Sequence, residues 1–138
     1  MIFSPIQKIE GSEWRLKIYP NGNENVEGIY LSVFIEMVST IHESTVYEYQ
    51  IEIVNRKNPH HRMIREYQST FEPGESWGYN KYIKLENLSR EGFIDTSTDE
   101  LEIKYYIRNP FYYNIYKQKE NYLQHLDSEL LRQEAEIK

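Results

Sequence analysis

From the N-terminus to about residue 110, apolar and polar side chains alternate in short runs, which is the pattern of strands with one buried face. In the clearest run, residues 101–108, Leu101 and Ile103 point inward while Glu102 and Lys104 point outward. Turn signals such as Asn21-Gly22 separate the runs. Short strands at this spacing predict an all-β domain, an antiparallel β-sandwich or barrel. The other runs cover residues 14–19, 30–37, 47–53, 63–71 and 79–85.

The pattern changes after Asn109 and Pro110. Residues 114–138 contain no Gly or Pro and are rich in Glu, Gln, Lys and Leu. They predict a C-terminal α-helix after a sandwich that covers residues 1–113. The helix either packs one apolar stripe on the sandwich or forms the stub of a coiled coil that assembles the protein, and a frayed tail is the third interpretation. Apolar residues recur every seven positions, with Leu126 between them and Lys119 and Gln133 interrupting the seam: Tyr116, Leu123, Leu130 and Ile137.

Composition narrows the classes of function. A chain of 138 residues is long enough for one domain with a real core, and its net charge of −6 argues against nucleic acid and anionic membrane as partners. The absence of cysteine fits a reducing compartment, and neither a signal peptide nor a membrane-spanning run is evident. We therefore expect a cytoplasmic or nuclear protein.

Motifs for catalysis are missing from the sequence. It has no cysteine nucleophile, no Gly-rich phosphate loop and no Gly-x-Ser-x-Gly elbow. His60 and His61 are adjacent in a polar loop, without the spacing of metal ligands. We expect no enzyme activity, catalytic residue, metal or cofactor. The many Tyr and Trp side chains leave a carbohydrate-binding sandwich as an alternative, which binding to immobilised sugars would test.

Ordered motifs between residues 3 and 113, among them Trp14, Tyr19-Pro20-Asn21-Gly22 and Gly74 to Tyr79, together resemble the MATH (meprin and TRAF homology) domain. Two further segments are similar to the MATH domain of tripartite-motif ubiquitin ligases, Tyr47-Glu48-Tyr49 and Ile64-Arg65-Glu66. The motifs shared with the wider family are Trp14, Tyr19-Pro20-Asn21-Gly22, Leu31-Ser32-Val33-Phe34, Gly74 to Tyr79 and Gly92-Phe93-Ile94.

The resemblance implies a TRAF/MATH-type sandwich of about seven or eight strands. It also implies a non-catalytic module that binds a short extended peptide of a partner, as the substrate-recognition domain of a ubiquitin E3 ligase. An alternative within protein recognition is a self-assembly module of a TRAF-like adaptor. Such a module would form homo-oligomers through the C-terminal helix or an open sheet edge.

The family's ligand lies across one sheet next to an edge strand, and its pocket aromatics correspond to Phe34, Tyr49, Trp77 and Tyr79. Gly78 would give a ligand backbone room to approach. We expect Trp77 to be partly accessible to solvent, with Phe34, Tyr49 and Tyr79 around it. Trp14, by contrast, alternates with charged residues and should lie in the core.

Two departures limit how much of the family's specificity applies here. Ser69 stands where adaptor-type relatives have a further aromatic residue. Glu75, Ser76 and Asn80 replace the lysines and aspartate that select Ser/Thr-rich peptides in those relatives. That ligand motif is therefore not expected, and Glu75 favours a ligand with a basic residue nearby.

A further departure concerns the fold. The family's first strand has no counterpart before Met1, so the sequence is either trimmed from a longer protein or completes that sheet edge in another way. An edge without its strand has unpaired backbone groups. We expect that edge to be exposed, or filled by another molecule or by the chain's own tail.

Overall fold

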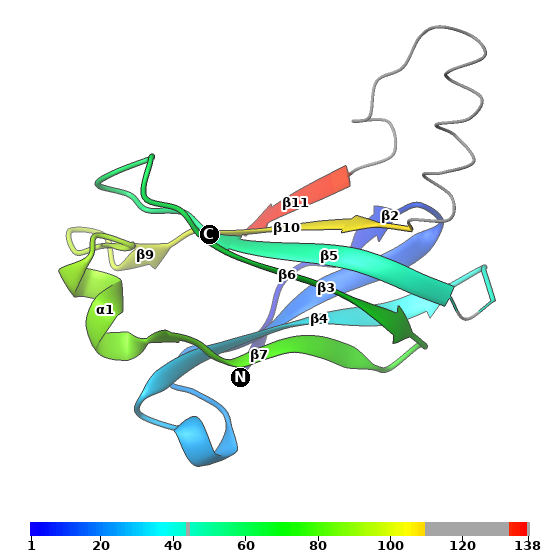
Figure 1. The fold of residues 1–138 in the computed structure, drawn as a ribbon, viewed down its shortest axis with the longest axis horizontal. Helices are drawn as coiled ribbons and strands as arrows, with labels where there is room; N and C mark the ends of the chain where they lie inside the picture. The colour runs from blue at the N-terminus through cyan, green and yellow to red at the C-terminus, as the bar shows by residue number, and fades with distance from the viewer. Residues whose placement is uncertain (44, 110–132, 138) are drawn as a thin grey trace, which may run out of the picture.

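The computed structural model describes residues 1–43, 45–109 and 133–137, which fold into two main antiparallel sheets (Figure 1). The first sheet has the order β1-β3-β4-β7, and β2 also pairs with β3. Its strands are β1 (Ile2–Phe3), β2 (Gln7–Ile9), β3 (Ser12–Tyr19), β4 (Tyr30–Thr40) and β7 (Ser76–Lys84). The second sheet has the order β11-β10-β5-β6. Its strands are β11 (Gln133–Ile137), β10 (Ile103–Arg108), β5 (Thr45–Ile53) and β6 (Met63–Phe71).

Short elements complete the described structure. They are the 3₁₀ helix η1 (Glu24–Val26), the helix α1 (Leu85–Arg90) and the small hairpin of β8 (Ile94–Asp95) with β9 (Glu100–Leu101). The antiparallel sandwich predicted from the alternating pattern is confirmed. Among the described residues, no helix is long and apolar enough to cross a membrane.

The core lies between the inward faces of the two sheets, and Trp14 on β3 is at its centre. Its indole is fully buried and meets the rings of Tyr47 and Phe71 edge to face, at centroid distances of 5.0 and 5.1 Å. The indole nitrogen donates a hydrogen bond to the Ile9 carbonyl (3.3 Å), so the only polar atom of the ring is satisfied. The predicted core position of Trp14 is confirmed.

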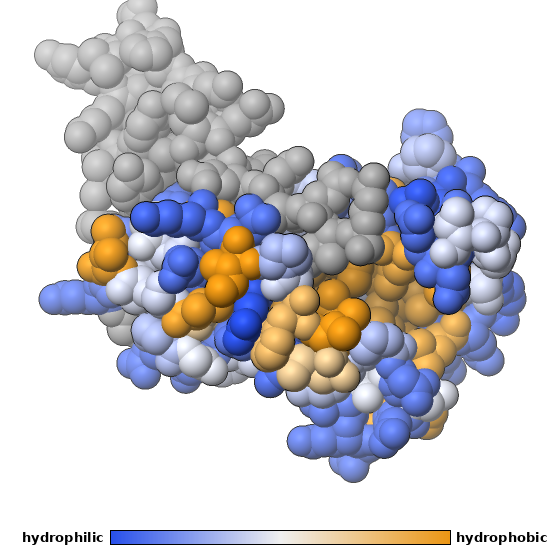
Figure 2. Space-filling model, turned by 180° about the vertical axis from the view of Figure 1, so that it is seen from behind, coloured by the Kyte–Doolittle hydropathy of each residue, from blue (hydrophilic) through white to orange (hydrophobic). Residues whose placement is uncertain are grey.

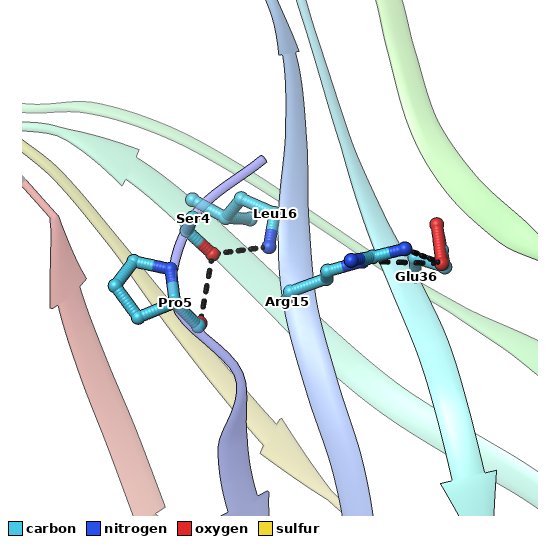
Figure 3. Close-up of polar contacts among 5 residues, drawn as sticks. All are labelled: Ser4, Pro5, Arg15, Leu16 and Glu36. Carbon is cyan, nitrogen blue, oxygen red and sulfur yellow. Dashed lines mark hydrogen bonds and ion pairs between the residues drawn. The ribbon is translucent and has the colours of Figure 1, made fainter. Parts of the chain in front are cut away.

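Ser4 and Pro5 separate β1 from β2 at the outer edge of the first sheet (Figure 3). The Ser4 hydroxyl accepts a hydrogen bond from the Leu16 amide (2.7 Å) and therefore holds the interrupted edge against β3. On the same strand, Arg15 forms an ion pair with Glu36 of β4 (3.0 Å). A side chain and two short strands thus bind the N-terminal segment to the sheet.

Apolar side chains also gather in places on the surface. Seen from behind the view of Figure 1, orange apolar groups form a patch among blue polar ones (Figure 2). The exposed apolar residues of the described surface include Ile2, Phe3, Tyr67 and Trp77. Two of these lie on the N-terminal edge of the first sheet, and two lie on the opposite side of the sandwich, on β6 and β7.

The C-terminal segment was predicted to be a helix, and the part of it that the structure describes, residues 133–137, is not helical. Most of the predicted helix, residues 110–132 and 138, lies outside the described residues. Residues Gln133–Ile137 form a strand instead of a helix end, and β11 pairs antiparallel with β10 from Ile103↔Ile137 to Ile107↔Gln133. The heptad pattern did not reveal this strand, because its stabilisation comes from the unpaired backbone groups of β10 and not from local helix propensity.

The tail and the N-terminal segment cover edges of different sheets. Residues 1–9 pair with β3 in the first sheet, so they do not cover β10 in the second. The chain's own tail covers the β10 edge.

Candidate functional site

The two edge strands β6 and β7 lie next to each other on one side of the sandwich, joined by the short turn of residues 72–75 (Figure 1). Each is the last strand of its sheet on that side. We call the surface between them the β6–β7 seam and define it by Tyr49, Tyr67, Ser69, Trp77 and Tyr79. A sandwich has no third layer over such a side, so inward-facing side chains there can stay accessible.

Trp77 and Tyr79 belong to the inward face of β7. They stand opposite Ile35 and Val33 of β4, which are both buried, and cross-strand partners share a face. The Trp77 side chain nevertheless remains 43% exposed, because β7 is at the edge. Tyr79 is half-buried and packs against Tyr82 edge to face at 5.9 Å. The expected partial exposure of Trp77 is found.

The second sheet contributes Tyr49, Ser69 and Tyr67. Tyr49 on β5 is buried and stands opposite Tyr67 on β6, whose ring is 68% exposed. Burial raises the pKa of the Tyr49 hydroxyl, and a hydrogen bond with Ser69 opposes that rise. The pKa of Tyr79 is also raised, first by burial and then by the nearby Tyr49. The tyrosines of both sheets therefore meet in the seam.

Phe34 does not join this group. It lies between buried Val33 and Ile35 on β4, opposite Gly78, so its side chain projects from the outer face of the sheet. There it meets the ring of Tyr19 edge to face at 6.0 Å. The four aromatics implied by the resemblance are thus divided between two faces.

Tyr67 was missed by sequence analysis, although it is the most exposed aromatic of the seam. Its position two residues before Ser69 puts both on the same side of β6, which was the available signal. The cross-strand partner that brings Tyr67 to Tyr49 follows only from the register of the sheet.

Position 78 must be glycine for a structural reason that the sequence did not reveal. A Cβ at this position would lie 2.2 Å from the Val33 carbonyl oxygen and 2.6 Å from the Phe34 Cα. The close approach of β4 therefore requires glycine here, whether or not a ligand approaches β7. A substitution of Gly78 would disturb the pairing of β4 with β7 before it disturbed any ligand.

The polar candidates lie along and beside β7. The Glu75 carboxylate accepts a hydrogen bond from the Glu72 amide (2.9 Å) and closes the turn before the strand. Ser76 and Asn80 alternate with Trp77 and Tyr79 and so belong to the outer side of β7. The Asn80 carbonyl accepts a hydrogen bond from the buried Ser32 hydroxyl (2.7 Å). Among these polar candidates only Glu75 carries a charge, and it lies at the turn end of the seam.

The backbone of β7 offers hydrogen-bonding groups at its open edge. The Met37 amide donates to the Glu75 carbonyl (3.1 Å), which sets the phase of the β4–β7 ladder. In an antiparallel pair, the backbone N–H and C=O groups of successive residues point alternately toward the partner strand and away from it. The groups of Trp77 therefore point toward β4, and those of Ser76 and Gly78 point away from it. No described strand pairs with β7 on that side.

The described residues give little support for a metal site or for a site elsewhere than the seam. They contain no group of three His, Asp or Glu side chains placed to hold a metal ion. An open depression of about 560 Å³ lies on the second sheet and contains an ion pair between Arg108 and Glu48 (2.6 Å). It is lined by polar and apolar side chains of β5, β6 and β10, including Ile107, and shares only Tyr49 and Tyr67 with the seam.

Comparison with known proteins identifies the class. A family model described as MATH domain matches residues 1–107, and the chain belongs to this family. It is 36% identical over 129 residues to the E3 ubiquitin-protein ligase TRIM37 of Mus musculus and, equally, to that of Homo sapiens. The match covers 92% of this chain and 13% of the length of each TRIM37 protein. This agrees with the predicted likeness to tripartite-motif ligases.

A more distant relative is the probable inactive serine/threonine-protein kinase fnkC of Dictyostelium discoideum. It is 30% identical over 110 residues, which is 73% of this chain and 8% of that protein. MATH domains are non-catalytic protein-interaction modules, so the chain is an interaction domain.

Proposed function

We propose that this domain binds an extended peptide segment of a partner protein, which adds as a strand to the open edge of β7. The observation that carries the proposal is the Trp77 side chain, which is 43% exposed on a face whose other members are largely buried, directly beside an unpaired strand edge. Exposed aromatic rings that become desolvated on binding are the usual energetic anchors of interfaces.

The ligand in this proposal makes two kinds of contact. Its backbone pairs with the edge groups of Ser76 and Gly78, and an apolar side chain packs on Trp77, Tyr79 and Tyr67. Main-chain hydrogen bonds then supply affinity and the seam supplies selectivity. Similarity to TRIM37 supports a further step, in which the peptide belongs to a substrate of a ubiquitin E3 ligase.

A peptide library tests the proposal directly. The purified domain is presented with an oriented library of immobilised extended dodecapeptides, and the Trp77→Ala and Phe3→Ala variants are compared with it. Phe3 is the matched control, because it is an aromatic with 41% exposure on the opposite edge of the same sheet. We expect Trp77→Ala to weaken binding by about 30-fold or more, as for an anchor worth roughly 2 kcal/mol. Phe3→Ala should bind normally.

Two further measurements distinguish strand addition from other modes. N-methylation of alternate amides in a bound peptide should abolish binding in one phase of alternation and leave it in the other. Binding of the domain to immobilised glycans, but not to peptides, would instead support a carbohydrate-binding sandwich. Equal binding by the wild type and Trp77→Ala would contradict the proposed site.

A further inference from the structure

Arg65 spans the far end of the β6–β7 seam. It lies on β6 opposite Ile51, and its side chain is exposed. The guanidinium donates a hydrogen bond from Nη2 to the Tyr82 carbonyl on β7 (3.1 Å) and lies 5.7 Å from the centre of the Tyr82 ring. A single side chain thus connects the two edge strands.

The carbonyl that Arg65 binds belongs to the open edge of β7. Near this end of the strand, Leu31 pairs with Ile83 and the Leu85 amide donates to the Ile29 carbonyl. Alternation therefore directs the Ile83 groups toward β4 and the Tyr82 carbonyl away from it. Because Arg65 takes this acceptor, a ligand strand that pairs with Ser76 and Gly78 meets the guanidinium at Tyr82.

Tyr82 provides a rigid base for this contact. Its ring is fully buried, and its single hydroxyl hydrogen lies between two acceptors, the backbone carbonyls of Ile51 and Met63 (3.0 Å from the hydroxyl oxygen to Met63). The position of the guanidinium is therefore set by a residue that is fixed to both sheets.

The charge of Arg65 has capacity left for a ligand. A guanidinium carries five N–H donors in a planar fork, and the bond to Tyr82 uses one of them. In the part of the chain that the structure describes, Arg65 forms no ion pair. The opposite end of the seam is acidic, with exposed Glu72 and Glu75 in the turn before β7. Glu72 and Glu75 thus stand at the turn end of the seam, and Arg65 stands at the Tyr82 end, where Glu66 and Glu52 are also close enough to act on Tyr79 and Tyr82.

We propose that Arg65 selects a carboxylate side chain of the bound peptide. This inference rests on the proposed function and names the chemistry of its ligand: an extended segment with one apolar residue on Trp77 and an Asp or Glu on the same side, toward Tyr82. Trp77 and Tyr82 are five positions apart in β7, and the β4–β7 register shifts between Tyr79 and Ile83. Residues on one face of a ligand strand are an even number of positions apart, so we place the two ligand residues about four positions apart. Bidentate carboxylate binding is the geometry that arginine favours.

The experiment uses the same dodecapeptide format with a fixed central leucine, one further position fixed as Glu, Gln or Lys, and the rest degenerate. With the wild type we expect Glu to be preferred over Gln by about threefold to tenfold at a position about four residues to one side of the leucine. Arg65→Gln, which can still donate to the Tyr82 carbonyl, should remove that preference. Arg65→Glu should transfer it to Lys. Arg90→Gln on α1 is the control, because it removes the same charge from an exposed site on another element.

The outcomes separate this inference from the function on which it rests. If peptides bind, Trp77→Ala loses them, and Arg65→Gln keeps the Glu preference, the role of Arg65 is wrong while the peptide site stands. If Arg90→Gln abolishes the preference as Arg65→Gln does, the effect is one of net charge, and the role of Arg65 is again wrong. If no library peptide binds the wild type, the proposed function fails and takes this inference with it. Melting curves of each variant confirm that the domains compared are folded.

Discussion

The two tryptophans of this chain have opposite surroundings, although both lie on strands of the same sheet. Trp14 is fully buried between Tyr47 and Phe71, whereas Trp77 is 43% exposed beside an unpaired edge. The difference comes from strand position and not from local sequence. It separates a residue needed for stability from one available to a partner.

Substitution of each tryptophan by alanine should reveal this difference. Trp14→Ala should lower the free energy of unfolding by about 3–5 kcal/mol, as large core truncations do. Trp77→Ala should lower it by less, about 1–2 kcal/mol, because 43% of this residue remains exposed in the folded domain. Urea denaturation followed by circular dichroism measures both. Comparable losses in the two variants would mean that Trp77 belongs to the core.

Glu10 makes folding sensitive to pH. Its Oε2 accepts a hydrogen bond from the Asn109 amide (3.0 Å), while Oε1 is buried and has no partner among the described residues. Burial raises the pKa of Glu10 to about 7, and the Asn109 amide and Arg108 only partly oppose it. The folded domain therefore holds the proton more tightly than the unfolded chain does.

The sign of the effect follows from linkage. The stabilisation from protonated Glu10 is complete below the unfolded pKa of 4.5 and is lost as the pH rises through about 7. Between pH 5 and 8 the wild type should lose about 1 kcal/mol, less than the full linkage value because the carboxyl is partly solvated. Urea titrations across this range should show a flatter profile for Glu10→Gln. An identical slope in the two proteins would rule out Glu10 as the source.

At the scale of elements, β7 combines tight pairing on one side with an open edge on the other. Gly78→Ala should destabilise the domain by about 1–3 kcal/mol, because the added methyl group has no space against the Val33 carbonyl of β4. Ser76→Ala, two residues earlier on the same side of the strand, should change stability by less than about 0.5 kcal/mol. Thermal unfolding of the pair measures the difference. A Gly78→Ala domain as stable as the wild type would show that β4 and β7 can move apart.

The second sheet depends on the chain's own tail at its outer edge, where β11 covers β10. Removal of residues 133–138 should leave the backbone groups of β10 unpaired and available to another chain. We expect faster hydrogen exchange in β10 and concentration-dependent association in sedimentation velocity. The intact chain, tested in parallel, should keep the slow exchange. Unchanged exchange and a monomer after truncation would show that β11 does not protect this edge.

For the whole molecule, the alternating pattern by itself determined an antiparallel sandwich or barrel and the burial of Trp14, because inward and outward positions of a strand follow a period of two. The motifs determined the family. The pattern after Pro110 did not predict β11. Local propensity there favours a helix, whereas the strand is stabilised by pairing with β10, which lies far away in the sequence.

The site depended on tertiary structure to a greater extent. Trp77, Tyr79 and Tyr49 could be named from the sequence, but Tyr67 and Arg65 join them through the β5–β6 register, and Phe34 leaves them through the β4–β7 register. Local sequence does not predict which strand lies at the edge of a sheet, or which edge strand of one sheet lies beside an edge strand of the other. Those relations arise from pairing between residues far apart in the chain, and they decided which aromatic side chains stay exposed and which cation lies beside them.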